Sequence, residues 1–353
     1  MVKSILKKIY LLTPYAKKRQ NEIIRKGTIS MLKAYKIEAI EKFQTERTLN
    51  GSLEDYLDAW EKHGVSYSEY MYQYEFWSLT ESQRNEYVSR MQMISFYRKY
   101  IPYEKKKYFI DKTLFLKTFS SYIHRIWMCG GGKQDFNRLH IQYNLIAKPI
   151  DGNCGQGIFL IPKGDNTKDW YSIISKNKML IEQCVEGCDE LQIFHPQSLN
   201  TIRVVTVVQD GVAKVFHSFF RVGSGKSLVD NAHAGGMFAQ VNIKTGVLES
   251  EAIDINGNRY EQHPDSNITF IGYQIPKWKE IVATCEAVAM SIKGVFIVGW
   301  DVTILKDGTI ELIEGNHGPD FDVMQSPLKI GIKKSIFDAI KSYYGDINLE
   351  LPK

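Results

Sequence analysis

The sequence contains no hydrophobic run that approaches the roughly 20 apolar residues needed to span a membrane as a helix. Its N-terminal apolar stretch is interrupted by Lys7 and Lys8, and no small-residue cleavage site follows it, so no secretory signal is predicted. We therefore expect a cytoplasmic protein. A position at the inner face of a membrane stays open, because the N-terminal segment is basic.

Cysteine is also scarce and unpatterned. The chain has five cysteines, and the close pair Cys184 and Cys188 lacks a second pair at the spacing of a zinc site. We interpret these two residues as free thiols in a reducing compartment. The sequence shows no internal repeat and no low-complexity tract, which leaves ordinary globular domains.

The composition is that of a globular protein with a sizeable core. Of the 353 residues, 44% are hydrophobic, 24% are charged and 12% are aromatic. The length suggests two domains, or one large domain with an extension. The formal net charge of +5 is modest for this size.

The positive charge is concentrated near the N-terminus. Between Met1 and Tyr35 there are nine Lys or Arg residues and one acid, Glu22. Ile5, Ile9 and Leu12 would lie on one face of a helix. Such a helix either makes weak peripheral contact with an anionic membrane or packs as a solvated helix on its own domain, and we favour the second interpretation.

The predicted secondary structure changes along the chain. Residues 1 to about 100 predict helices, with capping boxes at Ser66–Glu69 and Thr80–Gln83, in which the first and fourth residues satisfy each other's free N–H groups. From Leu145 onward, strand-like runs alternate with helical patterns and are joined mainly by hairpins. This pattern predicts an α+β fold rather than an all-parallel sheet.

The segment Val298–Val323 contains the strongest hairpin signal. Asp307 and Gly308 separate two runs rich in Val and Ile, which predicts a two-residue turn. In that register Lys306 pairs with Thr309, and the numbers of all paired residues sum to 615.

This register brings like charges together. Asp301 would lie directly opposite Glu314, and Asn316 would share their face of the sheet. Directly opposed carboxylates repel each other unless a cation lies between them. Two carboxylates and an amide oxygen suit Mg²⁺, so we predict a metal site at these three residues. The alternative is a pair of solvent-facing acids on an edge hairpin.

A glycine-rich loop follows Lys148. Gly152, Gly155 and Gly157 separate two strand-like runs and would let backbone N–H groups approach an anion, to which Lys148 adds a point charge. The loop is neither a P-loop nor a dinucleotide motif, because a strand rather than a helix follows it. The alternative is an ordinary hairpin turn that contains glycine.

Taken in order, these elements resemble the ATP-grasp superfamily, and within it the sugar-transfer-associated ATP-grasp family. The resemblance extends from about Asp111 to Asp322 and is strongest in SLNTIRVVTV, FRVGSGKSLVDNAHAGGMFAQVN and GWDVTILKDGTIELIEGN. It implies an ATP-grasp fold, in which two α+β subdomains clasp ATP. We expect a helical N-terminal region at 1–100, an N-terminal subdomain at 101–186, and a C-terminal subdomain at 187–353 with the metal hairpin and a closing helix.

The resemblance also implies nucleotide-binding residues. Lys112 resembles the early lysine that reaches the α-phosphate, and Lys148 resembles the second lysine, which precedes the flexible glycine loop. Glu182 would accept a hydrogen bond from the adenine amino group. The backbones of Gln183 and Val185 would touch the adenine edge.

Further ligands follow from the same comparison. The acid at the ribose is expected to be Asp189 or Glu190, between which the resemblance does not decide. Asp301, Glu314 and Asn316 match the family's Mg²⁺ ligands, for one or two ions.

One residue of the family pattern is lacking. Many ATP-grasp ligases carry an arginine just before the first metal aspartate, where it steadies the transition state, but the segment here reads GVFIVGWD. We propose Arg203 and Arg221, which lie in or at the end of neighbouring strands, as substitutes. The alternative is that each pairs with a surface acid.

The polar segment DNAHAGG resembles a loop at the acceptor or γ-phosphate end of the site. We expect Asp230, Asn231, Gly235 and Gly236 near the substrate. His233 is either a general base for an amine nucleophile, since its unperturbed pKa lies near working pH, or a hydrogen-bonded structural histidine.

The resemblance implies an ATP- and Mg²⁺-dependent ligase that joins a carboxylate to an amine through an acyl-phosphate and so forms a C–N bond. The family name implies a role in cell-surface polysaccharide or glycoconjugate biosynthesis. The alternatives are a kinase that phosphorylates a sugar hydroxyl and a non-catalytic nucleotide-binding scaffold. We expect small-molecule or glycan substrates and no nucleic-acid partner, and the sequence gives no oligomeric state.

Overall fold

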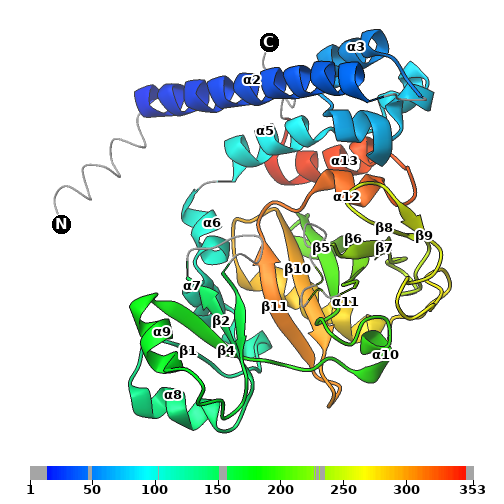
Figure 1. Ribbon diagram of the computed structural model, residues 1–353. Helices are drawn as coiled ribbons and strands as arrows, with labels where there is room; N and C mark the ends of the chain where they lie inside the picture. Colours follow the sequence, from blue (N-terminus) through cyan, green and yellow to red (C-terminus); the bar gives the residue numbers. More distant parts are fainter. Residues whose placement is uncertain are drawn as a thin grey trace. The chain divides into compact units, whose positions relative to one another are not determined.

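The computed structural model describes residues 14–46, 50–101, 103–150, 157–225, 227, 230 and 235–346 (Figure 1). The chain forms two compact units. We call Met1–Pro102 together with Asp320–Lys353 the helical unit, and Tyr103–Pro319 the sheet unit.

The sheet unit combines helices with two antiparallel sheets. Its helical segments are α6 (Tyr103–Ile110), α7 (Lys112–Thr118), η3 (Ser120–Tyr122), α8 (Lys133–His140), α9 (Trp170–Lys176), α10 (Asp189–Gln192) and α11 (Trp278–Ser291). Its strands are β1 (Trp127–Cys129), β2 (Leu145–Pro149), β3 (Phe159–Ile161), β4 (Met179–Gln183), β5 (Thr201–Gln209), β6 (Val212–Val222), β7 (Met237–Gln240), β8 (Ala252–Ile253), β9 (Arg259–Tyr260), β10 (Ile297–Ile304) and β11 (Ile310–Asn316). One sheet has the order β1-β4-β2-β3 and the other β11-β10-β5-β6-β7-β8-β9. This mixture confirms the predicted α+β class.

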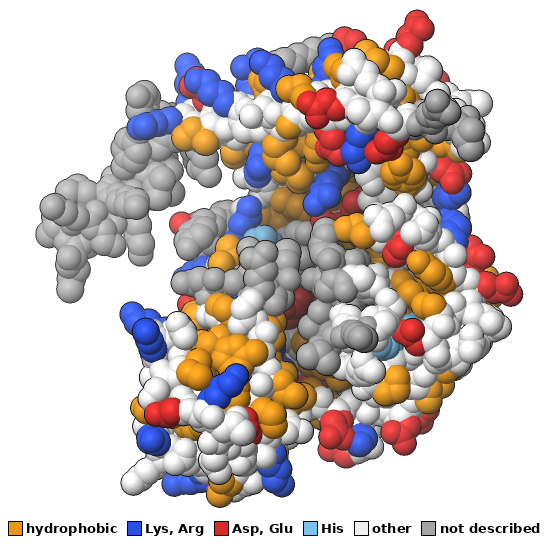
Figure 2. Space-filling model, viewed as in Figure 1, with side chains coloured by type: hydrophobic (Ala, Val, Ile, Leu, Met, Phe, Trp, Pro, Cys, Tyr) orange, Lys and Arg blue, Asp and Glu red, His pale blue; other side chains and the backbone are white. Residues whose placement is uncertain are grey.

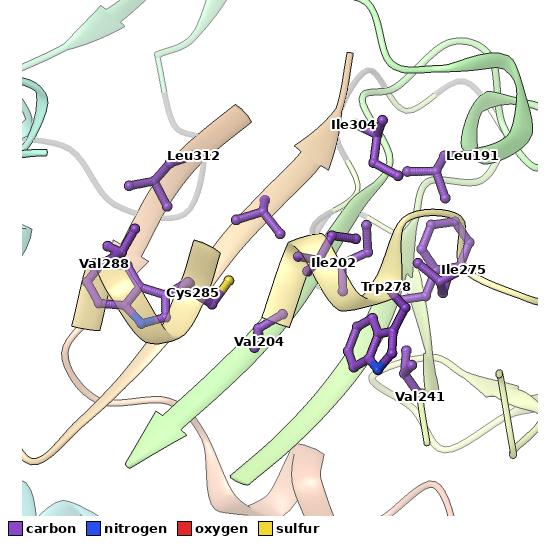
Figure 3. Close-up of a cluster of buried hydrophobic side chains, with 14 of the residues drawn as sticks. Leu191, Ile202, Val204, Val241, Ile275, Trp278, Cys285, Val288, Ile304 and Leu312 are labelled. Carbon is purple, nitrogen blue, oxygen red and sulfur yellow. The ribbon is translucent and has the colours of Figure 1, made fainter. Parts of the chain in front are cut away.

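Helices anchor each sheet through buried apolar side chains. Figure 3 shows Cys285 and Val288 of α11 packed with Ile202 and Val204 of β5 and with Leu312 of β11. Burying a Val, Leu or Ile side chain contributes roughly 1.5–3 kcal/mol, so this contact fixes the strands that carry the predicted metal residues. Helices α8 and α9 pack against the four-stranded sheet in the same way.

The β10–β11 hairpin departs from the predicted geometry at its turn. The N–H of Leu305 donates to the carbonyl of Thr309 at 2.8 Å, which makes a three-residue loop, 306–308. Gly308 has a φ of 86°, as the last position of such loops requires. The predicted pairing of Lys306 with Thr309 is therefore wrong.

A β-bulge restores the predicted register nearer the site. Val302 pairs with Leu312, whereas Asp301 pairs with Glu314, so Ile313 is an extra residue in β11. Because side chains alternate between the faces of a strand, this extra residue brings Glu314 to the face of Asp301. The predicted pairing of Asp301 with Glu314 is thus correct. The longer loop shifts the register by one residue, and the bulge shifts it back.

The described part of the helical unit consists of helical segments. They are α2 (Pro14–Thr45), α3 (Leu53–His63), η1 (Glu69–Gln73), η2 (Phe76–Ser78), α4 (Glu81–Arg84), α5 (Arg90–Tyr100), α12 (Phe321–Gln325) and α13 (Lys333–Tyr344). Both predicted capping boxes are present. Thr80 and Gln83 satisfy each other's backbone N–H groups, and so do Ser66 and Glu69.

Helix α2 carries exposed basic side chains, several of which are visible along it in Figure 2. The predicted amphipathic face of Ile5, Ile9 and Leu12 lies outside the described residues, so membrane contact stays a prediction. Among the helices that the structure describes, none is both long enough and apolar enough to cross a bilayer.

A group of buried charges lies within the helical unit. Asp322 of α12 is 4% exposed, and its Oδ1 has no hydrogen-bond partner among the described residues. Glu69 is fully buried and accepts backbone N–H groups from Ser66 and Arg90, each at 2.7 Å. Burial and repulsion from Asp320 raise the pKa of Asp322 to about 7.

We expect Asp322→Asn to stabilise the protein above neutral pH. An acid whose pKa is raised by folding favours the fold while it is protonated, so the stability of the wild type falls as the pH rises from about 4 through about 7. Removing this loss should stabilise the variant by on the order of 2–4 kcal/mol at about pH 8. Urea unfolding at about pH 5 and about pH 8 measures the change, with the exposed Asp338→Asn as control. Equal pH dependence in wild type and variant would refute the assignment.

Candidate active site

The two acids of the hairpin face each other from neighbouring strands. Asp301 of β10 is 2% exposed, whereas 62% of the Glu314 side chain is exposed. They are paired residues of β10 and β11, so their carboxylates repel each other when both are ionised. Reduced hydration and repulsion from Asp301 raise the pKa of Glu314 to about 7. Because this side chain is so exposed, we assign the shift mainly to the repulsion.

Two arginines compensate the charge of Asp301. Arg203 of β5 lies directly opposite it, donating from Nε to Oδ1 and from Nη2 to Oδ2, the latter at 2.7 Å. Arg221 of β6 donates from Nη1 to the same Oδ2 at 2.6 Å. Burial by itself would raise the pKa of Asp301, but the two arginines hold it well below its usual range. The structure therefore places both arginines at Asp301 rather than at surface acids.

A close approach of the backbone makes room for Arg203. A Cβ atom at Gly299 would lie 2.9 Å from Cδ of Arg203 and 3.1 Å from Cβ of Pro319. Gly299 pairs with Asn316, as the hairpin register predicts. Asn316 Oδ1 accepts the N–H of Gly318 at 3.0 Å and keeps one further lone pair.

Asp230, in the connection that follows β6, adds an acid to this group of charges. Its Oδ1 lies 3.4 Å from Nη2 of Arg221, and its Oδ2 accepts the hydroxyl proton of Thr201. Burial outweighs the attraction of Arg221 and raises the pKa of Asp230. Gly235, with a φ of 91°, accepts a hydrogen bond from Ser224 Oγ at 2.6 Å. Gly236 is buried, and the predicted residues Asn231 and His233 lie outside the described residues.

The connection that carries Asp230 is held by two buried histidines that the sequence did not single out. His195 Nε2 lies 3.0 Å from the carbonyl of Ser227, and His263 Nε2 lies 2.8 Å from that of Gly223. One ligand atom of each histidine and one of Asp265 lie within 4.8 Å of one another. His263 Nδ1 already accepts the N–H of Asp265 at 3.2 Å. We therefore interpret the group as an anchor for the connection.

The predicted lysines lie at one end of the four-stranded sheet. Lys148 of β2 pairs with the buried Glu182 of β4, and Lys112 Nζ donates to the carbonyl of Pro149 at 2.9 Å. Arg125 Nη2 donates to the other oxygen of Glu182 at 3.2 Å. Burial would raise the pKa of Glu182, but Lys148 and Arg125 lower it to about 2.

The glycine loop is described only at its end. Gly157 has a φ of 72°, and a Cβ there would lie 3.0 Å from Cγ of Pro149. Gly152 and Gly155 lie outside the described residues.

The predicted hinge follows β4. The N–H of Gln183 donates to the carbonyl of Ile126 at 2.7 Å, and its side-chain oxygen accepts the N–H of Ile126 at 3.2 Å. Val185 lies in the connection to α10, where Asp189 and Glu190 are both exposed. The choice between these two acids as the ribose ligand stays open.

The side-chain oxygens of the hairpin are suitable ligands for a hard divalent cation. Carboxylate and amide oxygens are the ligands that Mg²⁺ takes in proteins, and those of Asp301, Glu314 and Asn316 keep lone pairs beyond their present hydrogen bonds. Two carboxyl groups that face each other from paired positions mark a place where a cation would relieve repulsion.

The fold and the site together define an ATP-grasp protein. Lys148 and the hinge strand lie in one antiparallel sheet, Lys112 of α7 reaches the end of that sheet, and a larger antiparallel sheet carries the acid-bearing hairpin. The chain belongs to the sugar-transfer associated ATP-grasp family, whose model matches residues 92–341. The family and the fold expected from the sequence are therefore confirmed.

Several solved structures are similar to parts of this fold. The ATP-grasp ligase PsnB, complexed with minimal precursor, Mg and ADP, has 13% identity and a TM-score of 0.43, covering 70% of this chain and 65% of that chain. The ADP complex of purK, an N5-carboxyaminoimidazole ribonucleotide synthetase, has 11% identity and a TM-score of 0.39, covering 60% and 45%. The synthetase from Thermotoga maritima has 12% identity and a TM-score of 0.36, covering 64% and 50%.

This chain thus covers less than half of the purK chain and about two thirds of the PsnB chain. Similarities this distant carry no argument about activity. A search of curated proteins finds no match to the chain.

We expect Asp301→Asn to destabilise the protein. Arg203 and Arg221 would keep their charges in a buried place without the carboxylate that balances them, which costs about 3–5 kcal/mol when one partner of a buried ion pair is removed. Urea unfolding measures the loss. The control Glu280→Gln removes an exposed charge from α11 and should change stability by less than about 0.5 kcal/mol. A stability loss no larger than that of the control would show that the arginines do not depend on Asp301.

Proposed function

We propose that the protein is an ATP- and Mg²⁺-dependent ligase that activates a carboxylate as an acyl-phosphate and transfers the acyl group to an amine. The observation that supports this most directly is the convergence of two arginines and two opposed carboxyl groups on one point of the sheet. Phosphoryl transfer depends mainly on positioning and on neutralising negative charge, and these groups supply both. Membership of an ATP-grasp family supports the same reaction class.

We assign the phosphates to Lys112 and Lys148, together with the glycine loop. Both oxygens of Glu182 already accept hydrogen bonds, from Lys148 and from Arg125. We therefore propose that Glu182 orients Lys148, and that the backbone of residues 183–185 contacts the adenine edge. This revises the expectation that the Glu182 side chain binds the adenine amino group.

We assign the reacting end of the site to the seven-stranded sheet. Asp301, Glu314 and Asn316 would hold Mg²⁺, which would neutralise charge on the phosphoryl oxygens. Arg203 and Arg221 would face the carboxylate substrate and the transferred phosphoryl group. Arg221 also links Asp301 to Asp230, which supports a place for the connection between β6 and β7 beside the acceptor.

For the remaining residues of this connection we propose the following roles. Gly235 and Gly236 contribute backbone groups to the acceptor end. The roles of Asn231 and of His233, as a general base for the amine, stay predictions.

The substrates that we propose are a carboxylate and an amine of cell-surface polysaccharide or glycoconjugate biosynthesis, as the family description suggests. Within the chain we assign the nucleotide to 101–186 and the metal hairpin to 187–353. The structure groups Asp320–Lys353 with the helical N-terminal residues, to which we assign no role.

Trapping with hydroxylamine tests the ligase reaction. With ATP, Mg²⁺, hydroxylamine and a panel of uronic acids, an acyl-phosphate should yield a hydroxamate together with ADP and phosphate, because hydroxylamine replaces the amine as nucleophile. A stable sugar phosphate without any hydroxamate would instead identify a kinase. A thermal midpoint that rises with nucleotide, without formation of either product, would identify a non-catalytic nucleotide-binding scaffold.

We expect Glu314→Gln to remove most of the effect of Mg²⁺ on nucleotide binding. The amide cannot carry the charge that a cation requires, so the Mg²⁺-dependent gain in ADP affinity should fall at least about 10-fold. In the wild type this gain should also weaken as the pH falls below about 7, because Glu314 then holds its proton. Titration calorimetry with and without Mg²⁺ measures both effects, with Glu280→Gln as control. A gain unchanged in Glu314→Gln would end the assignment of Glu314 as a ligand.

A further inference from the structure

Arg125 lies at the bulge of β11, although no sequence motif pointed to it. It sits between η3 and β1, and its side chain is 3% exposed. Nη1 donates to the carbonyl of Leu312 at 2.7 Å, and Nη2 donates to that of Ile313 at 2.9 Å. These two carbonyls belong to the position where the register of β11 shifts. A bulge disrupts the ladder of backbone hydrogen bonds, and Arg125 supplies donors at that point.

The same guanidinium joins two sheets. Nη1 also donates to Glu311 of β11 at 2.6 Å, and Nη2 donates to Glu182 of β4 at 3.2 Å. Glu311 is fully buried and accepts the N–H of His124 at 2.7 Å as well. The rigid, planar fork of an arginine can make all these contacts at once, whereas a lysine ammonium is a single point charge.

The bulge decides which side chain faces Asp301. In the register that Val302 and Leu312 define, Asp301 would lie opposite Ile313, and Glu314 would point to the other face of the sheet. The extra residue in β11 is therefore what brings two carboxyl groups together. Whatever stabilises the bulge also stabilises that arrangement.

We infer that Arg125 is a positioning residue: it fixes the bulge and thereby holds Glu314 opposite Asp301. Through Glu182, which pairs with Lys148, it also links this arrangement to the lysine end of the four-stranded sheet. The inference rests on the proposed function for the identity of the ligands, a divalent cation and a nucleotide. Arg125 itself would contact neither the cation nor the nucleotide.

The test measures binding rather than turnover. Mn²⁺ accepts the same oxygen ligands as Mg²⁺, and its binding to the full chain with ADP can be followed by electron paramagnetic resonance. Arg125→Lys keeps the positive charge but cannot serve both bulge carbonyls and both carboxylates. We expect its Mn²⁺ affinity to fall at least about 10-fold, the size seen when a supporting contact of a metal ligand is lost. Its affinity for ADP without metal should change by less.

A double-mutant cycle with Glu314→Gln distinguishes positioning from a general loss of structure. If Arg125 acts through Glu314, the double variant should bind Mn²⁺ no more weakly than Glu314→Gln alone. Fully additive losses would overturn the inference, and so would an unchanged affinity in Arg125→Lys.

Arg84→Lys is a matched control. Arg84 is also buried and also bridges a carboxylate and a carbonyl, those of Asp55 and Phe76, but within the helical unit. It should lower the thermal midpoint without changing Mn²⁺ affinity. If it weakens Mn²⁺ binding as much as Arg125→Lys does, a general loss of stability explains the result and the inference fails.

The outcomes separate this inference from the proposed function. A wild type that binds neither Mn²⁺ nor ADP would overturn both, whereas a wild type that binds both with an unaffected Arg125→Lys overturns only the inference. If Arg125→Lys does not fold, the pair Arg125→Gln and Glu311→Gln removes both charges of one buried ion pair together. The same cycle with Glu314→Gln then applies to that variant.

Discussion

The arrangement of the site depends on the charge balance around one buried carboxylate. A buried charge is tolerated only where it is paired and hydrogen-bonded, and Asp301 meets that condition through Arg203 and Arg221. These arginines come from β5 and β6, which follow β10 in the order of the seven-stranded sheet. A slip of either strand by one residue would turn an arginine to the other face and leave Asp301 uncompensated. The ion pairs therefore favour one register of these three strands, whatever their net contribution to stability.

A second chain of alternating charges crosses from one sheet to the other. It runs from Lys148 through Glu182 and Arg125 to Glu311. Strand β11 takes part in both groups, because it carries Glu311 at one end of this chain and Glu314 beside Asp301. Buried networks of this kind specify one geometry when every member is satisfied, since any other arrangement leaves a charge unpaired in a poorly hydrated place.

How much of this could be predicted from the sequence depends on the range of the contacts. The presence of the hairpin follows from local turn chemistry and strand alternation, whereas the facing of Asp301 and Glu314 depends on a longer loop and a bulge that these rules did not predict. The bulge could not be predicted, because its carbonyls, those of Leu312 and Ile313, accept hydrogen bonds from Arg125, which is far away in the chain. The convergence of Arg203 and Arg221 on Asp301 likewise required the strand order, which no local pattern contains. The family resemblance supplied candidates there, and the structure supplied their partners.

In the described structure, three of the cationic groups assigned to ATP and the carboxylate are already paired with acids of the chain itself. Lys148 is held by Glu182, and Arg203 and Arg221 are held by Asp301. Under the proposed function, the arginines can turn their charge toward an anion only if another positive charge replaces them at Asp301. A cation bound by the side-chain oxygens of the hairpin would supply that positive charge. It would lie beside Glu314, whose pKa is raised to about 7. The binding of metal and of phosphate would then be mutually dependent, because each removes the electrostatic obstacle to the other.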